Sequence, residues 1–189
     1  MAADAFCETT IGYKDPKNGE LFKMAFDCPA LKVGTVQDTV GVELCGALKN
    51  IVAIGAGFCD GLGYGGNTKA AIIRIGLKEM IKFCKTFYKG IDDDTFLESC
   101  GVADLITTCY GGRNRKCAEA YAKHGKKKSL EEIEAELLGG QKLQGTLTAK
   151  EVNHVLKMKG LESEFPFFTT VYKISYEDTP LSAITETPY

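Results

Sequence analysis

A long and almost uncharged apolar pattern, Val40 to Ala56, constrains the fold of this chain more than any other feature. It is too long for one strand, so it predicts a helix that is buried on most sides. Further helical patterns cover Thr68 to Tyr88, Val102 to Thr108 and Arg113 to Lys123, and others open at Ser129, Thr148 and Pro166. Thr95 to Glu98 and Ser129 to Glu132 have the spacing of capping boxes. The sequence therefore predicts an all-α fold, a compact multi-helix domain over residues 37–189.

The residues before this domain have a different character. Ala5 to Gly12 and Leu31 to Val36 are short and β-prone, and Glu20 to Phe26 between them could form a short helix. Lys14 to Gly19 is rich in turn-forming residues. Two strands do not make a stable sheet by themselves. We expect residues 1–36 to be a β remnant of a larger sheet, or a strand pair packed against the helices.

Composition narrows the function classes. Hydrophobic residues make up 44% of the chain and charged residues 25%, which argues against disorder. The formal net charge of -2 gives no general attraction to nucleic acid or to anionic membranes. No uninterrupted apolar stretch reaches the roughly 18 residues that a membrane span needs, and the N-terminus does not resemble a signal peptide. We therefore expect no nucleic-acid partner and no membrane partner.

The 8 cysteines are scattered, mostly within apolar runs, and form no CxxC pair. Free buried thiols behave as small hydrophobic side chains, which favours a reducing cytosol. With only 2 histidines in the chain, no zinc site is indicated.

The segment Gly61 to Gly66 matches the dinucleotide-binding pattern G-x-G-x-x-G. Its context does not fit that motif, because the preceding apolar pattern is too long for a strand. No β-α-β alternation follows it either. The segment is better interpreted as a glycine-rich connection between two closely packed helices.

Lys49 is the first candidate for chemistry. It lies among apolar residues and beside Asn50. A lysine in such surroundings would lose hydration, which favours its neutral form and suits proton transfer near neutral pH. The alternative is a lysine whose stem packs while its ammonium group reaches water.

A second candidate site combines Asp104, Thr108, Arg113 and Asn114. Asp104 and Thr108 share a helix face, and a glycine pair then lets the chain turn into a new helix at Arg113. A helix N-terminus and a guanidinium group both suit a phosphate, while the other side chains could bind hydroxyls. The alternative is an arginine that only pairs with Asp104 or with a helix end. A polar loop, Gly139 to Gly145, could close over a ligand or simply connect two helices.

Several segments together resemble NAD-dependent glycerol-3-phosphate dehydrogenases. They are Glu43 to Asn50, Gly55 to Gly63, Asn67 to Ala70, Phe96 to Cys109, Gly111 to Arg115 and Gln141 to Gly145. The resemblance runs from about Phe6 to about Tyr176 and is close to the eukaryotic cytosolic form. It implies interconversion of dihydroxyacetone phosphate and sn-glycerol 3-phosphate with NAD, in a cytoplasmic homodimer.

The resemblance also implies a fold and a set of roles. The helices would form a substrate-binding and dimerisation domain of the 6-phosphogluconate-dehydrogenase-like type, and the two strands would belong to a Rossmann sheet. Lys49 would be the catalytic proton donor or acceptor. Substrate binding would involve Arg113, Asn114, Asp104, Thr108 and Asn50, and cofactor binding would involve Arg113, Lys142 and Gln144.

The family's glycine-rich nucleotide-binding segment and a second active-site lysine do not occur in this sequence. We therefore expect the chain alone to bind NAD poorly and to turn over little substrate. Two other functions stay open. The chain could be a non-catalytic helical dimerisation or metabolite-binding module, or part of a related oxidoreductase that acts on another hydroxy acid.

Overall fold

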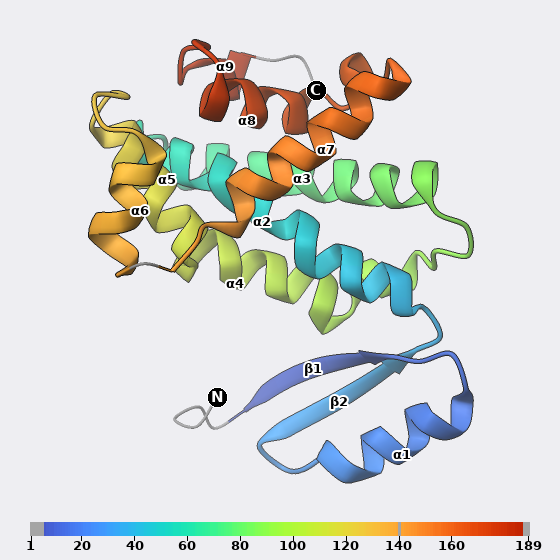
Figure 1. The fold of residues 1–189 in the computed structure, drawn as a ribbon. Coiled ribbons are helices and arrows are strands. Elements are labelled where there is room, and N and C mark those ends of the chain that lie inside the picture. The colour runs from blue at the N-terminus through green and yellow to red at the C-terminus, as the bar shows by residue number, and fades with distance from the viewer. Residues whose placement is uncertain (1–5, 140, 187–189) are drawn as a thin grey trace. The chain divides into compact units, whose positions relative to one another are not determined.

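The computed structural model describes residues 6–139 and 141–186, and helices dominate this part of the chain (Figure 1). This confirms the predicted all-α fold class with two short strands in front. The chain divides into two compact units. One contains the residues up to Gly46 together with Ile81–Asp104, and the other contains Ala47–Met80 together with the residues from Leu105 onward. The predicted domain boundary between residues 36 and 37 stays a prediction.

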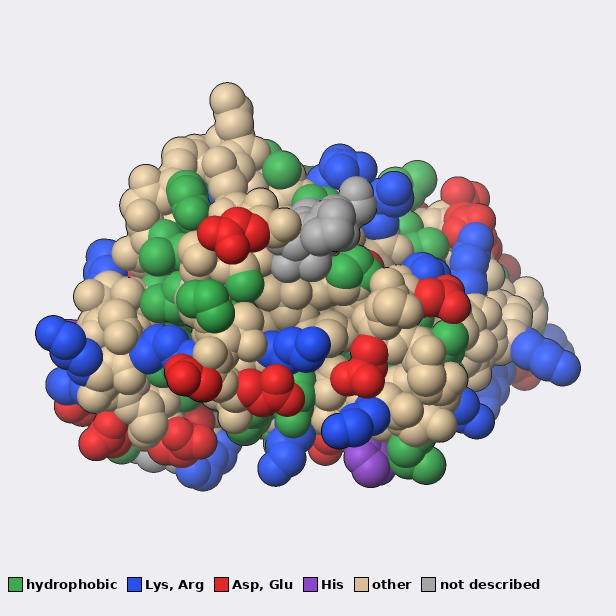
Figure 2. Space-filling view, turned by 90° about the horizontal axis from the view of Figure 1, so that it is seen from above, with side chains coloured by type: hydrophobic (Ala, Val, Ile, Leu, Met, Phe, Trp, Pro, Cys, Tyr) green, Lys and Arg blue, Asp and Glu red, His purple; other side chains and the backbone are tan. Residues whose placement is uncertain are grey.

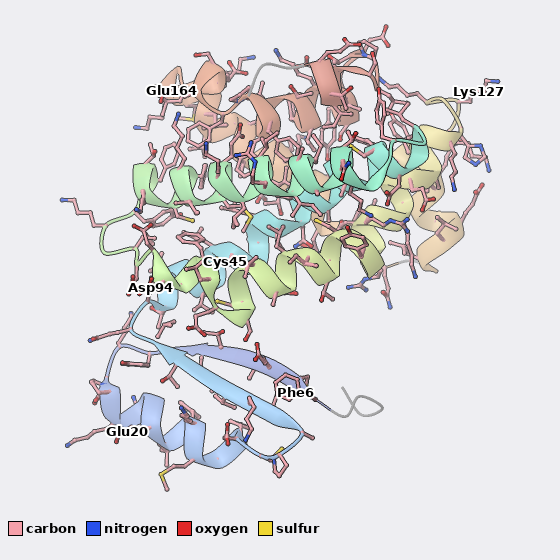
Figure 3. All side chains as sticks on the ribbon, turned by 180° about the vertical axis from the view of Figure 1, so that it is seen from behind. Phe6, Glu20, Cys45, Asp94, Lys127 and Glu164 are labelled. Carbon is pink, nitrogen blue, oxygen red and sulfur yellow. The ribbon has the colours of Figure 1, made fainter. Side chains whose placement is uncertain are left out.

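The first unit begins with a parallel strand pair. β1 (Cys7–Gly12) and β2 (Leu31–Val36) pair in parallel, and α1 (Pro16–Phe26) connects them. In Figure 3, Phe6 lies just before β1 and Glu20 lies on α1. The strands and the short helix confirm the prediction, but α1 begins at Pro16 rather than at Glu20, so only Lys14 and Asp15 of the turn-rich segment form a bend. Asp15 caps the helix by accepting a hydrogen bond from Lys17 N, and Pro16 fits the first helical turn.

The predicted capping box at Thr95 to Glu98 was also wrong. A short 3₁₀ segment, Asp94–Leu97, forms there and no side chain caps it. The Thr95 hydroxyl instead donates to Asp38 Oδ2 at 2.9 Å. The second oxygen of Asp38, Oδ1, accepts a hydrogen bond from Gly41 N at 2.8 Å, near the start of α2. A long-range partner therefore takes the hydroxyl that a local cap would have used.

The long apolar pattern forms α2 (Thr39–Gly61), and α3 (Gly66–Phe87) follows it. The glycine-rich segment between them is a helix connection, as predicted. Among the described residues, α2 is the one helix long and apolar enough to pass a membrane-span test, and 61% of its most apolar window is buried inside the protein. A buried core helix has the same length and apolar composition as a membrane-spanning helix, so these properties of α2 are weak evidence that it crosses a membrane.

Glycines allow α2 to approach α5 (Arg113–Lys123) closely. A Cβ atom at Gly57 would lie 2.4 Å from the carbonyl oxygen of Arg115, and one at Gly61 would lie 2.5 Å from that of Glu119. Real Cβ atoms do not come so near backbone atoms, because close packing leaves no room for them. The two backbones therefore meet only because these positions lack side chains.

The other helices are α4 (Asp104–Gly111), α6 (Leu130–Leu138), α7 (Gln144–Lys159), α8 (Pro166–Tyr176) and α9 (Ala183–Glu186). Ser129 and Glu132 form the predicted capping box of α6. α7 begins four residues before the predicted start at Thr148. Pro166 opens α8 as predicted, and Glu79 of α3 accepts hydrogen bonds from Phe167 N and Phe168 N at 2.8 and 2.9 Å. Gly140, part of the polar loop, lies outside the described residues.

The surface carries charges of both signs. On the face shown in Figure 2, basic and acidic side chains are interspersed rather than gathered by sign. All eight cysteines are free thiols, and Cys45, Cys59, Cys84, Cys109 and Cys117 are buried. This agrees with the interpretation of most cysteines as core residues.

Candidate active site

Lys49 and Asn50 lie in the middle of α2, one turn after Cys45, which is labelled in Figure 3. Both are half-buried. Their neighbours in the helix are apolar and buried, because Leu48 is 2% exposed and Ile51 is fully buried. The helix therefore fixes the backbone of Lys49 firmly, while part of its side chain remains accessible.

A chain of amide hydrogen bonds joins three helices beside Lys49. Asn114 Nδ2 donates to Asn50 Oδ1 at 2.9 Å, and Gly145 N donates to Asn114 Oδ1 at 2.9 Å. Asn114 is 8% exposed, so these bonds are largely shielded from water. They connect α2, α5 and the first turn of α7. The structure thus brings together the sequence neighbours of Lys49 and Arg113 and the end of the polar loop.

Gly145 allows this meeting of helices. A Cβ atom at this position would lie 2.5 Å from the carbonyl oxygen of Asn50 and 2.9 Å from Asn114 Oδ1. Sequence reasoning singled out the loop that ends at Gly145 but gave this glycine no role of its own. Its partner is 31 residues away in the chain, so no local pattern could have identified it.

Arg113 is the first residue of α5 and is exposed. Its guanidinium group donates a hydrogen bond to the side-chain oxygen of Gln141 in the polar loop. The turn that precedes it depends on Gly112, where a Cβ atom would lie 2.6 Å from the carbonyl oxygen of Thr108. The predicted tight glycine turn between α4 and α5 is therefore present, and it exposes Arg113 at a helix N-terminus.

Asp104 and Thr108 occupy α4, one helical turn apart, and both are half-buried. Asp104 starts the helix, and Thr108 lies near the turn that leads to α5. Their spacing agrees with the predicted shared helix face.

The loop residues alternate between inward and outward positions. Leu143 is 4% exposed, and Gly145 is buried, whereas Lys142 and Gln144 are exposed. Glu134 of α6 binds the loop through both carboxylate oxygens. Oε2 accepts a hydrogen bond from Leu143 N at 2.8 Å, and Oε1 lies 3.0 Å from Lys142 Nζ. The backbone hydrogen bond from Leu143, together with Lys142, lowers the pKa of the Glu134 carboxyl group.

Comparison with known proteins decides the family. Residues 38–186 match the family described as NAD-dependent glycerol-3-phosphate dehydrogenase C-terminus. The chain belongs to this family.

Curated relatives agree with this membership. The rat protein named glycerol-3-phosphate dehydrogenase (NAD+), cytoplasmic, is 60% identical over 182 residues, which are 96% of this chain and 52% of the relative. A zebrafish glycerol-3-phosphate dehydrogenase 1-like protein is 62% identical over 183 residues, with the same coverage. The chain therefore spans about half the length of these relatives.

Solved structures named as glycerol-3-phosphate dehydrogenases have the same fold. The Plasmodium falciparum glycerol-3-phosphate dehydrogenase has a TM-score of 0.92 and 47% identity, with 96% of this chain and 51% of that chain covered. The enzyme of Dunaliella salina has a TM-score of 0.90 and 49% identity, with 95% and 31% covered. The helices that carry Lys49, Arg113 and Gly145 thus belong to a fold that this family shares.

Proposed function

We propose that this chain is the substrate-binding and proton-transferring half of an NAD-dependent glycerol-3-phosphate dehydrogenase. It would interconvert dihydroxyacetone phosphate and sn-glycerol 3-phosphate. The hydrogen bond between Asn114 and Asn50 supports the proposal best. It joins two residues that each follow a candidate site residue in the sequence, Arg113 and Lys49.

In this proposal, Lys49 transfers the proton. When dihydroxyacetone phosphate is reduced, a hydride adds to the carbonyl carbon and the carbonyl oxygen gains a proton from the ammonium group of Lys49. In the reverse direction, the neutral amine takes the hydroxyl proton. The position of Lys49 supports this role, because its buried neighbours fix its place on α2 while part of its own side chain remains accessible to a substrate. A positioned proton donor contributes roughly 10²–10⁴-fold to a rate.

Arg113 and its neighbours would bind the substrate. The exposed guanidinium group at the start of α5 suits phosphate oxygens, and the helix N-terminus adds positive potential. Asn114 and Asn50 would hold the substrate through their amide groups, and Asp104 and Thr108 would bind its hydroxyl groups.

The residues of the polar loop fit a nicotinamide cofactor. Lys142 has a side chain that is 80% exposed, and Gln144 is exposed beside it. Together with Arg113 they offer cationic and amide donors, which match the oxygens of a pyrophosphate group. The cofactor supplies the hydride. We also propose that the protein is cytoplasmic and forms a homodimer, as the resemblance implies.

A direct test joins this chain to the nucleotide-binding segment of a relative and measures NADH oxidation by dihydroxyacetone phosphate. We expect activity in the fused protein and a decrease of kcat by about 10²–10⁴-fold in the variant Lys49→Ala. Lys78→Ala is the matched control, since Lys78 is an exposed lysine of α3. It should leave kcat unchanged.

Two outcomes would contradict the proposal. If the fused protein folds but shows no activity, the chain is better described as a helical module without catalysis. If Lys49→Ala retains a kcat within a few-fold of the parent, another group transfers the proton.

A further inference from the structure

Side-chain contacts from α5 and α6 hold the described residues of the polar loop, which leads into the first turn of α7. Arg113 donates to Gln141, Glu134 pairs with Lys142, Glu134 accepts from Leu143 N, and Gly145 N donates to Asn114. Only Glu134 makes two of these contacts. It also differs from the other partners because it comes from α6, the helix immediately before the loop, and α6 packs against α5.

The two contacts of Glu134, with Leu143 N and with Lys142 Nζ, differ in exposure and in strength. The side chain of Glu134 is only 13% exposed, and its hydrogen bond with Leu143 N is partly buried. The side chain of Lys142 is 80% exposed. A carboxylate that accepts a backbone N–H forms a strong, charge-assisted hydrogen bond, whereas an ion pair with an exposed lysine is weak. Glu134 therefore fixes the backbone of the loop while it holds the lysine loosely.

Buried and exposed residues alternate between Lys142 and Gly145, so fixing the backbone at Leu143 also fixes which side chains face outward. Leu143 and Gly145 face inward, so Lys142 and Gln144, which flank Leu143, are left on the outer side. If Leu143 N lost its acceptor, a buried donor would have to find another partner or turn toward water. The outward residues would then lose their fixed position.

We propose that Glu134 is a positioning residue that sets the loop Gln141–Gln144 in place for the cofactor. The ammonium group of Lys142 can leave the carboxylate of Glu134 for a phosphate oxygen, while the hydrogen bond from Leu143 N keeps the loop where it is. This inference rests on the proposed function of Lys142 and Gln144. Glu134 itself touches neither substrate nor cofactor.

The first test measures hydrogen exchange of the Leu143 amide in the 189-residue chain. Glu134→Ala should speed exchange at this amide by at least about threefold, the effect of losing one hydrogen bond. Glu134→Gln keeps an acceptor oxygen and should give a smaller increase. The control is Glu136→Ala, because Glu136 lies on the same helix and, among the described residues, forms its ion pair with Lys128, at 2.7 Å. Unchanged exchange in Glu134→Ala would overturn the proposal.

The second test uses kinetics in the fused protein described above. Glu134→Ala should raise KM for NADH by about 3- to 10-fold, again the size of one hydrogen bond, with kcat and KM for dihydroxyacetone phosphate nearly unchanged. A general loss of structure would lower kcat or raise both KM values. If KM for NADH moves no more than in Glu136→Ala, Glu134 is not a positioning residue.

The two tests separate this proposal from the proposed function. If the fused protein is inactive with every variant, the proposed function fails, and the exchange test still decides whether Glu134 anchors the loop. If Lys49→Ala behaves as expected and Glu134→Ala matches Glu136→Ala, only the role of Glu134 is refuted.

Discussion

Arg113 and Arg115 lie two positions apart on α5, yet their surroundings differ in kind. The side chain of Arg115 is 20% exposed and pairs with Asp60 at 2.6 Å and with Glu119 at 2.9 Å. Arg113 is exposed and donates to the neutral amide of Gln141. Within residues 6–139 and 141–186, the structure shows no ion pair for Arg113. The positive charge of Arg115 is therefore neutralised within the fold, whereas that of Arg113 remains available to an anion.

The region around Arg115 is a compact ionic cluster. Asp60 Oδ2 accepts from Arg115 and also from Lys69 Nζ at 2.7 Å, and the side chain of Lys69 is only 7% exposed. Lys69 Nζ also lies 4.2 Å from the centre of the Tyr110 ring, a cation–π distance. Asp60 therefore bridges two cations that have little access to water, and Glu119 supplies a second negative charge beside Arg115.

The largest expected effect comes from breaking this cluster. Asp60→Asn removes the shared carboxylate and leaves Lys69 buried without it. We expect the free energy of unfolding to fall by about 3–5 kcal/mol, as for other broken buried ion pairs. Urea denaturation checks this. Glu136→Gln, which removes an exposed ion pair, should cost less than about 1 kcal/mol. Equal losses in the two variants would mean that the Asp60 cluster does not stabilise the fold.

Arg113 is expected to affect substrate binding and not stability. Arg113→Ala should change the free energy of unfolding by less than about 0.5 kcal/mol, since its side chain is exposed. In the fused protein it should raise KM for dihydroxyacetone phosphate by about 10- to 100-fold, the effect of losing a charged hydrogen bond. Arg115→Ala should do the reverse, with lower stability and a nearly unchanged KM. Denaturation and steady-state kinetics on both variants measure this. The division fails if both arginines affect stability alike.

A third prediction concerns the amide chain next to Arg113. Gly145→Ala places a Cβ atom 2.5 Å from the carbonyl oxygen of Asn50, so the helices must move apart. We expect a loss of about 1–3 kcal/mol, the usual cost of overpacking. Gly66→Ala is the control, because a Cβ atom there meets nothing within 4 Å. Its stability in thermal melting should be unchanged or slightly higher. An unaffected Gly145→Ala variant would show that α7 can shift without cost.

The smallest effect is a pH dependence at Glu134. Its pKa is lower in the folded protein than its ordinary value of about 4.5, because Leu143 N–H and Lys142 favour the carboxylate. The stabilisation is therefore fully present above pH 4.5 and is lost as the pH falls through the lowered pKa. We expect the stability difference between the parent and Glu134→Gln to stay below about 1 kcal/mol and to shrink in acid. A difference that grew in acid would have the wrong sign. Denaturation curves between pH 3 and pH 7, a range set by ordinary carboxyl titration, measure it.

Local signals predicted part of this structure well. α5 covers Arg113 to Lys123 as expected. Its start was predictable because a glycine pair precedes it and ends the preceding helix. The capping box at Ser129 was also found, since both of its hydrogen bonds lie within four residues. In both cases the chemistry that fixes the element lies beside it in the sequence.

Long-range partners explain two of the failures, the missing capping box at Thr95 and the early start of α7. α7 starts early because Asn114, 31 residues away, accepts the hydrogen bond from Gly145 N in its first turn. The start of α8 was predicted correctly, but the acceptor of its first turn, Glu79, is 88 residues away and was not. No window of sequence contains both members of such a pair. For the candidate site, the segments that carry Asn50, Arg113 and Asn114 were identified from the sequence, but their mutual contacts, and the part of Glu134, were not.

The position of Asn114 has a consequence for how substitutions should be tolerated in this family. Its side chain must donate to Asn50 and accept from Gly145 over a fixed span. Aspartate at this position would lack the donor, and glutamine would add a methylene group where three helices already touch. The two hydrogen bonds that join the helices therefore favour asparagine at position 114 whether or not a ligand is bound. Invariance there in an evolutionary comparison would be expected from folding alone.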